Sequence, residues 1–163
     1  MKTILFQGDS ITDTGRNREN NISLGTGYAL MTAGKILVDY PGQYQCINKG
    51  VSGNRCVDLY ARIKLDAINL APDILTILIG VNDVWHEFAR QNGVSAPKFE
   101  KIMDMYLSEI KEALPNIQIL MLEPFVLPGT ATEANLEGFT EEVKLRAQAC
   151  KRLAEKYQLT LAE

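Results

Sequence analysis

The chain has 163 residues, of which 46% are apolar and 23% are charged, and these proportions are typical of one soluble globular domain. The net charge of −3, with no basic stretch to offset it, argues against nucleic-acid binding, and no apolar run approaches the ~20 residues of a membrane span. Three scattered cysteines without a CxxC pair, and an N-terminus that enters its first apolar run at once, predict a cytoplasmic protein with reduced thiols.

The first part of the chain alternates short apolar runs with amphipathic segments. The run Ile4–Phe6 predicts a buried strand, and Gly8–Ser10 predicts a tight turn after it. A polar loop is expected over residues 15–25, a helix over residues 26–38, and a second strand over residues 44–48. The apolar face of that helix is expected to consist of Tyr28, Met31, Ile36 and Leu37.

The middle of the chain contains its most apolar run. A glycine-bearing corner over residues 48–54 precedes a single predicted helix, which ends at Ala71–Asp73. The apolar positions of this helix are Val57, Tyr60, Ile63 and Ile68. The run Ile74–Ile79 then predicts a central parallel strand, and Gly80–Asp83 closes it.

The last part of the chain repeats the alternation. Pro97 is expected to begin a helix that Pro115 ends, and residues 117–122 predict a fourth strand. A long surface loop is expected over residues 123–138. The spacing of the apolar residues Phe139, Val143, Ala147, Cys150, Leu153 and Tyr157 predicts a helix through about Lys156, and a fifth strand begins near Leu159.

Strands that alternate with helices predict right-handed crossovers and a parallel sheet covered on both faces. We therefore expect an α/β fold, a three-layer α/β/α domain with a doubly wound sheet of flavodoxin-like strand order. Residues 1–163 would form one domain, without repeats or linkers. A domain that stops inside a strand is unusual, which predicts truncation at the C-terminus.

Three breaks in the apolar pattern fall at the carboxyl ends of the first three strands, at Gly8–Ser10, Gly50–Asn54 and Gly80–Asp83. In an open α/β sheet these ends lie at one edge, where such folds place their chemistry. The breaks offer a hydroxyl, a glycine whose N–H can be approached closely, and an amide side chain. These groups suit attack on an acyl carbonyl and stabilisation of the oxyanion. Considered alone, Ser10 could equally be a helix cap.

The three breaks together resemble the SGNH (GDSL) family of serine esterases and lipases. The resemblance rests on Gly8–Thr12, on Gly53 within residues 48–54, and on Gly80–Asp83. It implies an acyl-enzyme mechanism without metal or cofactor, in which Ser10 is the nucleophile. The oxyanion hole would consist of the N–H groups of Ser10 and Gly53 and the side-chain amide of Asn82. Asp9 and Asp83 are expected to brace their turns rather than to transfer protons.

The chain also departs from the family pattern. Family members carry their catalytic Asp and His in a final Asp-x-x-His block after the fifth strand, and no such block follows that strand here. Truncation is the favoured interpretation, and a complete protein without the base is the alternative. His86 is the only histidine and thus the only candidate base, which Glu87 could orient. A histidine in a loop near a site is more often a substrate contact or a surface residue. Trp85 is expected to line the pocket or to belong to the core.

We therefore expect a carboxylic-ester hydrolase that acts on a small ester, with an acylated carbohydrate as one option. A non-catalytic module that binds acylated glycans or a protein partner is the alternative from another class. If the chain ends at Glu163, an uncovered apolar edge would promote homo-oligomers.

Overall fold

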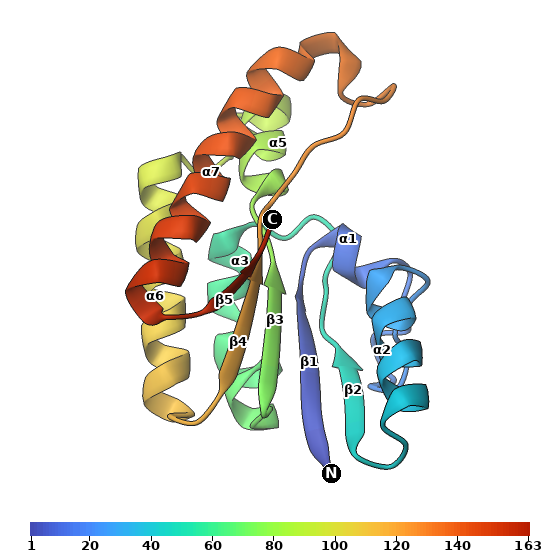
Figure 1. The fold of residues 1–163 in the computed structure, drawn as a ribbon. Coiled ribbons are helices and arrows are strands. Elements are labelled where there is room, and N and C mark those ends of the chain that lie inside the picture. The colour runs from blue at the N-terminus through green and yellow to red at the C-terminus, as the bar shows by residue number, and fades with distance from the viewer.

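A computed structural model describes residues 1–163. Five parallel strands form one sheet with the order β2-β1-β3-β4-β5, the flavodoxin-like order that the sequence predicts. The strands are β1 (Lys2–Gly8), β2 (Tyr44–Asn48), β3 (Ile74–Leu78), β4 (Gln118–Leu122) and β5 (Thr160–Ala162). All carboxyl ends lie at the same edge of the sheet, which we call the carboxyl edge (Figure 1).

Helices lie on both sides of the sheet, with α2 on one face and α3, α6 and α7 on the other (Figure 1). The helices are α1 (Ser10–Asp13), α2 (Tyr28–Asp39), α3 (Cys56–Ala61), α4 (Ile63–Asp66), α5 (Val81–Arg90), α6 (Ala96–Ala113) and α7 (Leu136–Tyr157). Two short 3₁₀ segments, η1 (Ile68–Leu70) and η2 (Glu133–Asn135), complete the structure. The apolar length that a bilayer-crossing segment needs is found in none of the helices.

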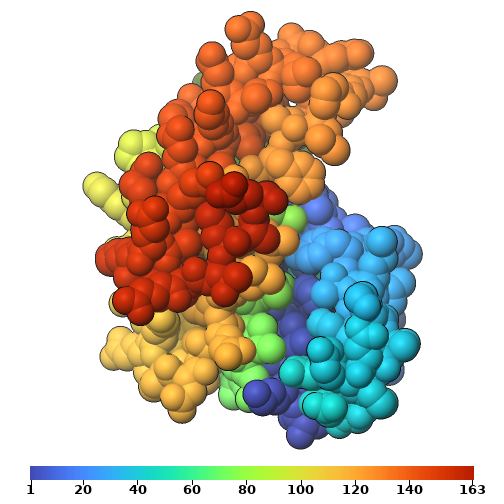
Figure 2. All heavy atoms as spheres, viewed as in Figure 1, coloured from blue at the N-terminus to red at the C-terminus, as the bar shows by residue number.

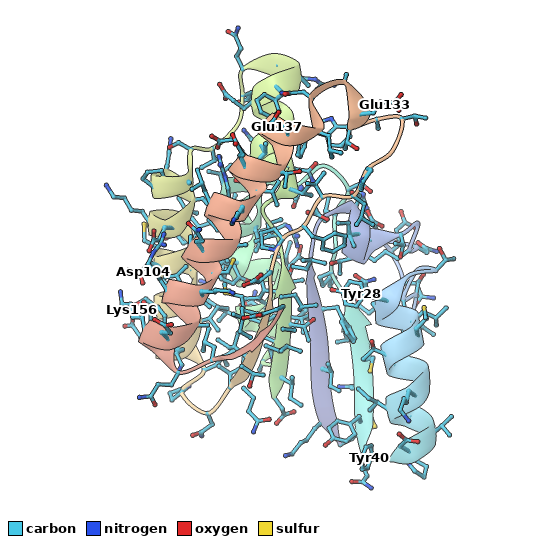
Figure 3. The ribbon with its side chains drawn as sticks, turned by 45° about the horizontal axis from the view of Figure 1, so that its top comes forward. Tyr28, Tyr40, Asp104, Glu133, Glu137 and Lys156 are labelled. Atoms are coloured by element: carbon cyan, nitrogen blue, oxygen red, sulfur yellow. The ribbon has the colours of Figure 1, made fainter.

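Successive side chains of a strand point to opposite faces of the sheet, so the core has two parts, one on each face. Leu5 of β1 and Ile77 of β3 point into the larger core, where they meet buried residues of α6 such as Phe99. Ile4 and Phe6, the neighbours of Leu5, point to the opposite face and pack under α2. The helices α6 and α7 are also joined at the surface, where Lys156 Nζ lies 2.6 Å from Asp104 Oδ1 (Figure 3).

The face under α2 is covered only in part. In Figure 2, atoms of β3 (green) and β4 (orange) are visible between α2 and the red C-terminal segment. Ile74, Leu120 and Leu122 on these strands accordingly keep part of their surface exposed. The prediction of two covered faces is therefore right for β1 and β2 and incomplete for the other strands.

The buried face of α2 differs from the prediction. Met31 is 74% exposed and Leu37 is 40% exposed, whereas Ala29 and Ala33 are fully buried. Small side chains let the helix approach the strands closely, and this leaves the larger residues at the flanks. Tyr28 stays on the buried side, with its ring edge-on to Phe6 at 5.9 Å.

Two further predictions are wrong in detail. The single helix expected after residue 54 is instead two helices, α3 and α4. They are separated at Arg62, whose backbone angles, φ −108° and ψ 12°, are not helical. The sequence also predicts no helix between Gly80 and Pro97, whereas α5 begins at Val81 and carries Asn82, Trp85 and His86. The long loop after β4 is present, and it runs above the carboxyl edge before α7 begins (Figure 1).

Candidate active site

The first corner of the site places the hydroxyl of Ser10 at the surface. β1 ends at Gly8, Asp9 caps the short helix α1, and Ser10 is the first, exposed residue of that helix. A side chain at position 8 would put its Cβ 2.3 Å from Oγ1 of Thr12 and 2.4 Å from the carbonyl oxygen of Leu78, so only glycine fits. The Ser10 hydroxyl makes no hydrogen bond within the chain.

Asp9 is the buried support of this corner. Its Oδ1 accepts a hydrogen bond from the N–H of Ile11 at 2.9 Å, which holds the turn as the sequence predicts. Its Oδ2 is buried without a partner. Burial raises the pKa of Asp9 to about 6, because a charged carboxylate is poorly solvated there.

The second corner, residues 49–54, is hydrogen-bonded to the first. The N–H of Val51 donates to the carbonyl oxygen of Gly8 at 3.1 Å, and the N–H of Ser52 donates to Oδ2 of Asp13 at 2.9 Å. Gly53 follows on the exposed surface with φ +83°, a conformation that favours glycine. These bonds bring Gly53 to the same edge as Ser10.

The third corner is tied to the second. Asn82, in the first turn of α5, is 9% exposed, and its Nδ2 donates to the carbonyl oxygen of Asn54 at 3.1 Å. Both carboxylate oxygens of Asp83 lie 3.1 Å from the N–H of Cys56, which donates to them. Burial raises the pKa of Asp83 to about 6. Asp83 therefore braces the neighbouring corner rather than its own turn.

The three corners thus assemble from segments that are far apart in sequence. One N–H of the Asn82 amide is used by Asn54, and the other remains available to a ligand. An exposed hydroxyl, an exposed glycine N–H and this amide are the groups expected from the sequence, and they lie along one edge. The arrangement can attack a carbonyl carbon and donate hydrogen bonds to the oxygen that becomes negative.

His86 is on the same face of α5 as Asn82, one turn later, and its side chain makes no hydrogen bond to Ser10. Glu87 does not orient it, because the Glu87 carboxylate accepts the N–H of Gly93 at 2.9 Å. Asp83 stands three positions before His86, but its carboxylate is turned to Cys56. His86 therefore has a hydrogen bond neither to the proposed nucleophile nor to a carboxylate that could orient it.

Trp85 packs into a small apolar cluster on α5 and α7. Its ring lies edge-on to Phe139, with 5.2 Å between the centroids, and Val84 is buried beside them. The side chain is partly exposed. These are the contacts of a packing residue, which is one of the two roles that the sequence predicts for it.

Three residues that hold the corners together were not singled out from the sequence. Asn54 supplies the acceptor for Asn82, Asp13 accepts from Ser52, and Arg62 bonds to both the first and second corners. Hydrogen bonds from Arg18 and Ser52 lower the pKa of Asp13 although burial alone would raise it. No sequence signal marks Arg62, because it lies opposite the apolar positions Val57, Tyr60 and Ile63 of the predicted helix.

No group of three or more His, Cys, Asp or Glu side chains lies together in residues 1–163 in a way that could hold a metal ion. The three cysteines are buried and unpaired, and burial raises the pKa of Cys46, Cys56 and Cys150. The thiols are thus protonated and are poor nucleophiles.

Comparisons with known proteins show which proteins this chain is similar to. Residues 6–163 match the family described as GDSL-like lipase/acylhydrolase. An acetylxylan esterase of Geobacillus stearothermophilus is 36% identical over 135 residues, which span 77% of this chain and 61% of that protein. The chain therefore covers less than two thirds of this curated relative.

Solved structures are similar over almost the whole chain. A candidate GDSL-like lipase from Parabacteroides merdae superposes with a TM-score of 0.92 at 36% identity, covering 99% of this chain and 77% of that one. The acetylxylan esterase Axe2 of Geobacillus stearothermophilus gives a TM-score of 0.87 at 31% identity, covering 99% and 75%. Catalytic mutants of Axe2 replace a serine, an aspartate and a histidine, the last two of them three positions apart.

Proposed function

We propose that this chain, which belongs to the GDSL-like lipase/acylhydrolase family, hydrolyses carboxylic esters with Ser10 as the nucleophile. The observation that carries the proposal is the set of hydrogen bonds joining the three corners. Val51 and Ser52 donate to the Ser10 corner, and Asn82 donates to Asn54. A family fold alone would not require these polar groups to converge.

In this mechanism Oγ of Ser10 attacks the acyl carbon, and the carbonyl oxygen becomes an oxyanion. The oxyanion accepts hydrogen bonds from the N–H groups of Ser10 and Gly53 and from Nδ2 of Asn82. The alcohol takes up the proton that Ser10 gave to the base and leaves as the carbonyl re-forms. Water then hydrolyses the acyl-serine, which releases the acid and restores the Ser10 hydroxyl. Removal of one oxyanion donor typically raises the barrier by about 3–4 kcal/mol.

The proton of the Ser10 hydroxyl needs a base. The geometry does not favour His86, which has neither a bond to Ser10 nor a carboxylate partner. The Axe2 mutants point to a histidine with an aspartate three positions before it in that protein. His86 is the only histidine of the 163 residues, so these residues do not supply such a pair, and the activity assays proposed below use a chain that carries one.

For the substrate we propose a small acetyl ester, with an acetylated carbohydrate as the first choice. The support is the similarity to the acetylxylan esterase at 36% identity. The acyl group in such a substrate is small, which suits an exposed Ser10 that is reached directly from solvent.

The test compares Ser10→Ala with the matched control Ser52→Ala, because both serines are exposed on neighbouring corners. Hydrolysis of an aryl acetate is measured together with labelling by a serine-directed organophosphonate, followed by intact mass. Ser10→Ala should abolish both signals, and Ser52→Ala should keep both. Labelling that persists in Ser10→Ala would move the nucleophile elsewhere. A wild-type protein that binds acetylated xylo-oligosaccharides but never reacts would favour the binding module instead.

A further inference from the structure

Arg62 occupies the break between α3 and α4, behind the carboxyl edge. Its backbone is not helical, and its side chain is only 15% exposed. The guanidinium donates to five different groups, from residues 7, 8, 49, 54 and 66. A charged group held by so many acceptors has one defined position.

Two of these bonds reach the end of β1. Nη2 donates to the carbonyl oxygen of Gly8 at 3.1 Å, and Nη1 donates to Oε1 of Gln7 at 2.8 Å. Gly8 stands two residues before Ser10, and its carbonyl oxygen also accepts the N–H of Val51. Arg62 thus holds the segment from which the nucleophile corner starts.

Two other bonds reach the corner that carries Gly53. Nε donates to Oδ1 of Asn54 at 2.7 Å, and Nη1 donates to the carbonyl oxygen of Lys49 at 2.8 Å. Asn54 follows Gly53 directly, and its backbone oxygen accepts the Nδ2 donor of Asn82. The same side chain therefore supports two of the three proposed oxyanion donors, those of Gly53 and Asn82.

The planar guanidinium makes these contacts mutually dependent. Its nitrogens have fixed separations, so the Gly8 oxygen and the Asn54 side chain cannot move apart without breaking a bond to Arg62. A lysine carries the charge but only one nitrogen, so it cannot hold both acceptors in this way. The remaining contact, 3.1 Å from Nη1 to Oδ2 of Asp66, is an ordinary pair at helical spacing.

We propose that Arg62 is a positioning residue, which sets the distance between the Ser10 nucleophile and the oxyanion donors of Gly53 and Asn82. It touches neither of the reacting atoms and acts through Gly8 and Asn54. The inference rests on the proposed function in one respect, since catalysis is one of its two readouts.

The experiment compares Arg62→Lys and Arg62→Gln with Leu59→Ala, a core variant of α3 whose side chain is 1% exposed and makes no contact of this kind. Both Arg62 variants should lower kcat for an aryl acetate by about 10–100-fold with KM within about twofold, since small displacements of reacting groups have effects of this size. Leu59→Ala should lower the thermal midpoint and keep kcat. In ¹⁵N-labelled protein, the signals of the Gly53 amide and the Asn82 side-chain amide should shift in the Arg62 variants only.

Unchanged kcat in both Arg62 variants would overturn the proposal, as would an equal loss of kcat in Leu59→Ala. If the wild type hydrolyses no ester, the proposed function fails, and the nuclear magnetic resonance arm decides alone. Shifts confined to the Arg62 variants would then support the positioning role. Gly53 and Asn82 signals that stay in place would refute it.

Discussion

Asp83 should make the stability of this protein depend on pH, and Asp83→Asn should remove that dependence. The carboxyl group is fully buried against the N–H of Cys56. Burial raises its pKa from the ordinary 3.8 to about 6 in the folded protein. The unfolded chain leaves the same group in water with its ordinary pKa.

The sign follows from which state holds the proton. Below pH 3.8 the group is protonated in both states and contributes nothing. As the pH rises from there to about 6, the unfolded chain has released the proton that the folded protein still holds, so the free energy of unfolding falls. Above that window Asp83 is ionised in both the folded and the unfolded state. The pKa difference of about two units then corresponds to a total loss of about 3 kcal/mol in the free energy of unfolding.

Urea unfolding of the wild type and of Asp83→Asn at several values between pH 4 and pH 7 measures this effect. The Asn side-chain oxygen can still accept the N–H of Cys56, so any change in that bond is a constant offset. Other titrating groups, including Asp9, cancel in the difference between the two proteins. The stability of Asp83→Asn relative to wild type should therefore rise by about 3 kcal/mol across the window.

Asp39→Asn is the control, because Asp39 pairs with Lys35 on the exposed side of α2 and its side chain is 44% exposed. Its difference from wild type should change little with pH. A difference for Asp83→Asn that stays the same at every pH would refute the reasoning, because it would mean that burial does not favour the protonated carboxyl.

Three other outcomes are expected. Asn82→Ala should lower kcat by about 10²–10³-fold with little change in KM in steady-state assays, since the amide binds charge that develops only in the transition state; a change in KM alone would make it a binding residue. Gly8→Ala should disrupt the Ser10 corner, because the added Cβ would lie 2.3 Å from Oγ1 of Thr12, and a wild-type melting curve with normal organophosphonate labelling would contradict this. Gly53→Ala keeps the N–H but imposes φ +83° on a residue with a side chain, so urea unfolding should show a loss of about 1–2 kcal/mol. Its kcat should fall less than that of Asn82→Ala, and a larger fall would mean that the strain displaces the corner.

The order of strands and helices could be predicted from the sequence because each is a local pattern. Runs such as Ile74–Ile79 and breaks such as Gly8–Ser10 identify buried strands and the turns after them, whatever they pack against. Because strands alternate with helices along the chain, the strands are expected to be parallel. This arrangement places Ser10, Gly53 and Asn82 at one edge of the sheet. The family could be recognised for the same reason, since its motifs are those breaks.

Contacts between segments could not be read in this way. Alternation of apolar residues does not say that Ala29 and Ala33, rather than Met31, would face the sheet, because that depends on how closely the helix approaches its strands. It also does not say that a helix would stop at Arg62. Arg62 bonds to Gly8 and Asn54 at this break, and these bonds exist only after folding.

Local patterns in the amino-acid sequence are therefore enough to predict the fold class, the strand order and the types of residue at the site. That Asp83 holds Cys56, that Asn54 orients Asn82 and that His86 has no bond to Ser10 is known only from the folded chain. The two kinds of information differ in how far apart in sequence the interacting residues are. Burial patterns and turn preferences depend on neighbours within a few positions, whereas a hydrogen bond between corners needs two side chains that many residues separate and that the sheet alone brings together.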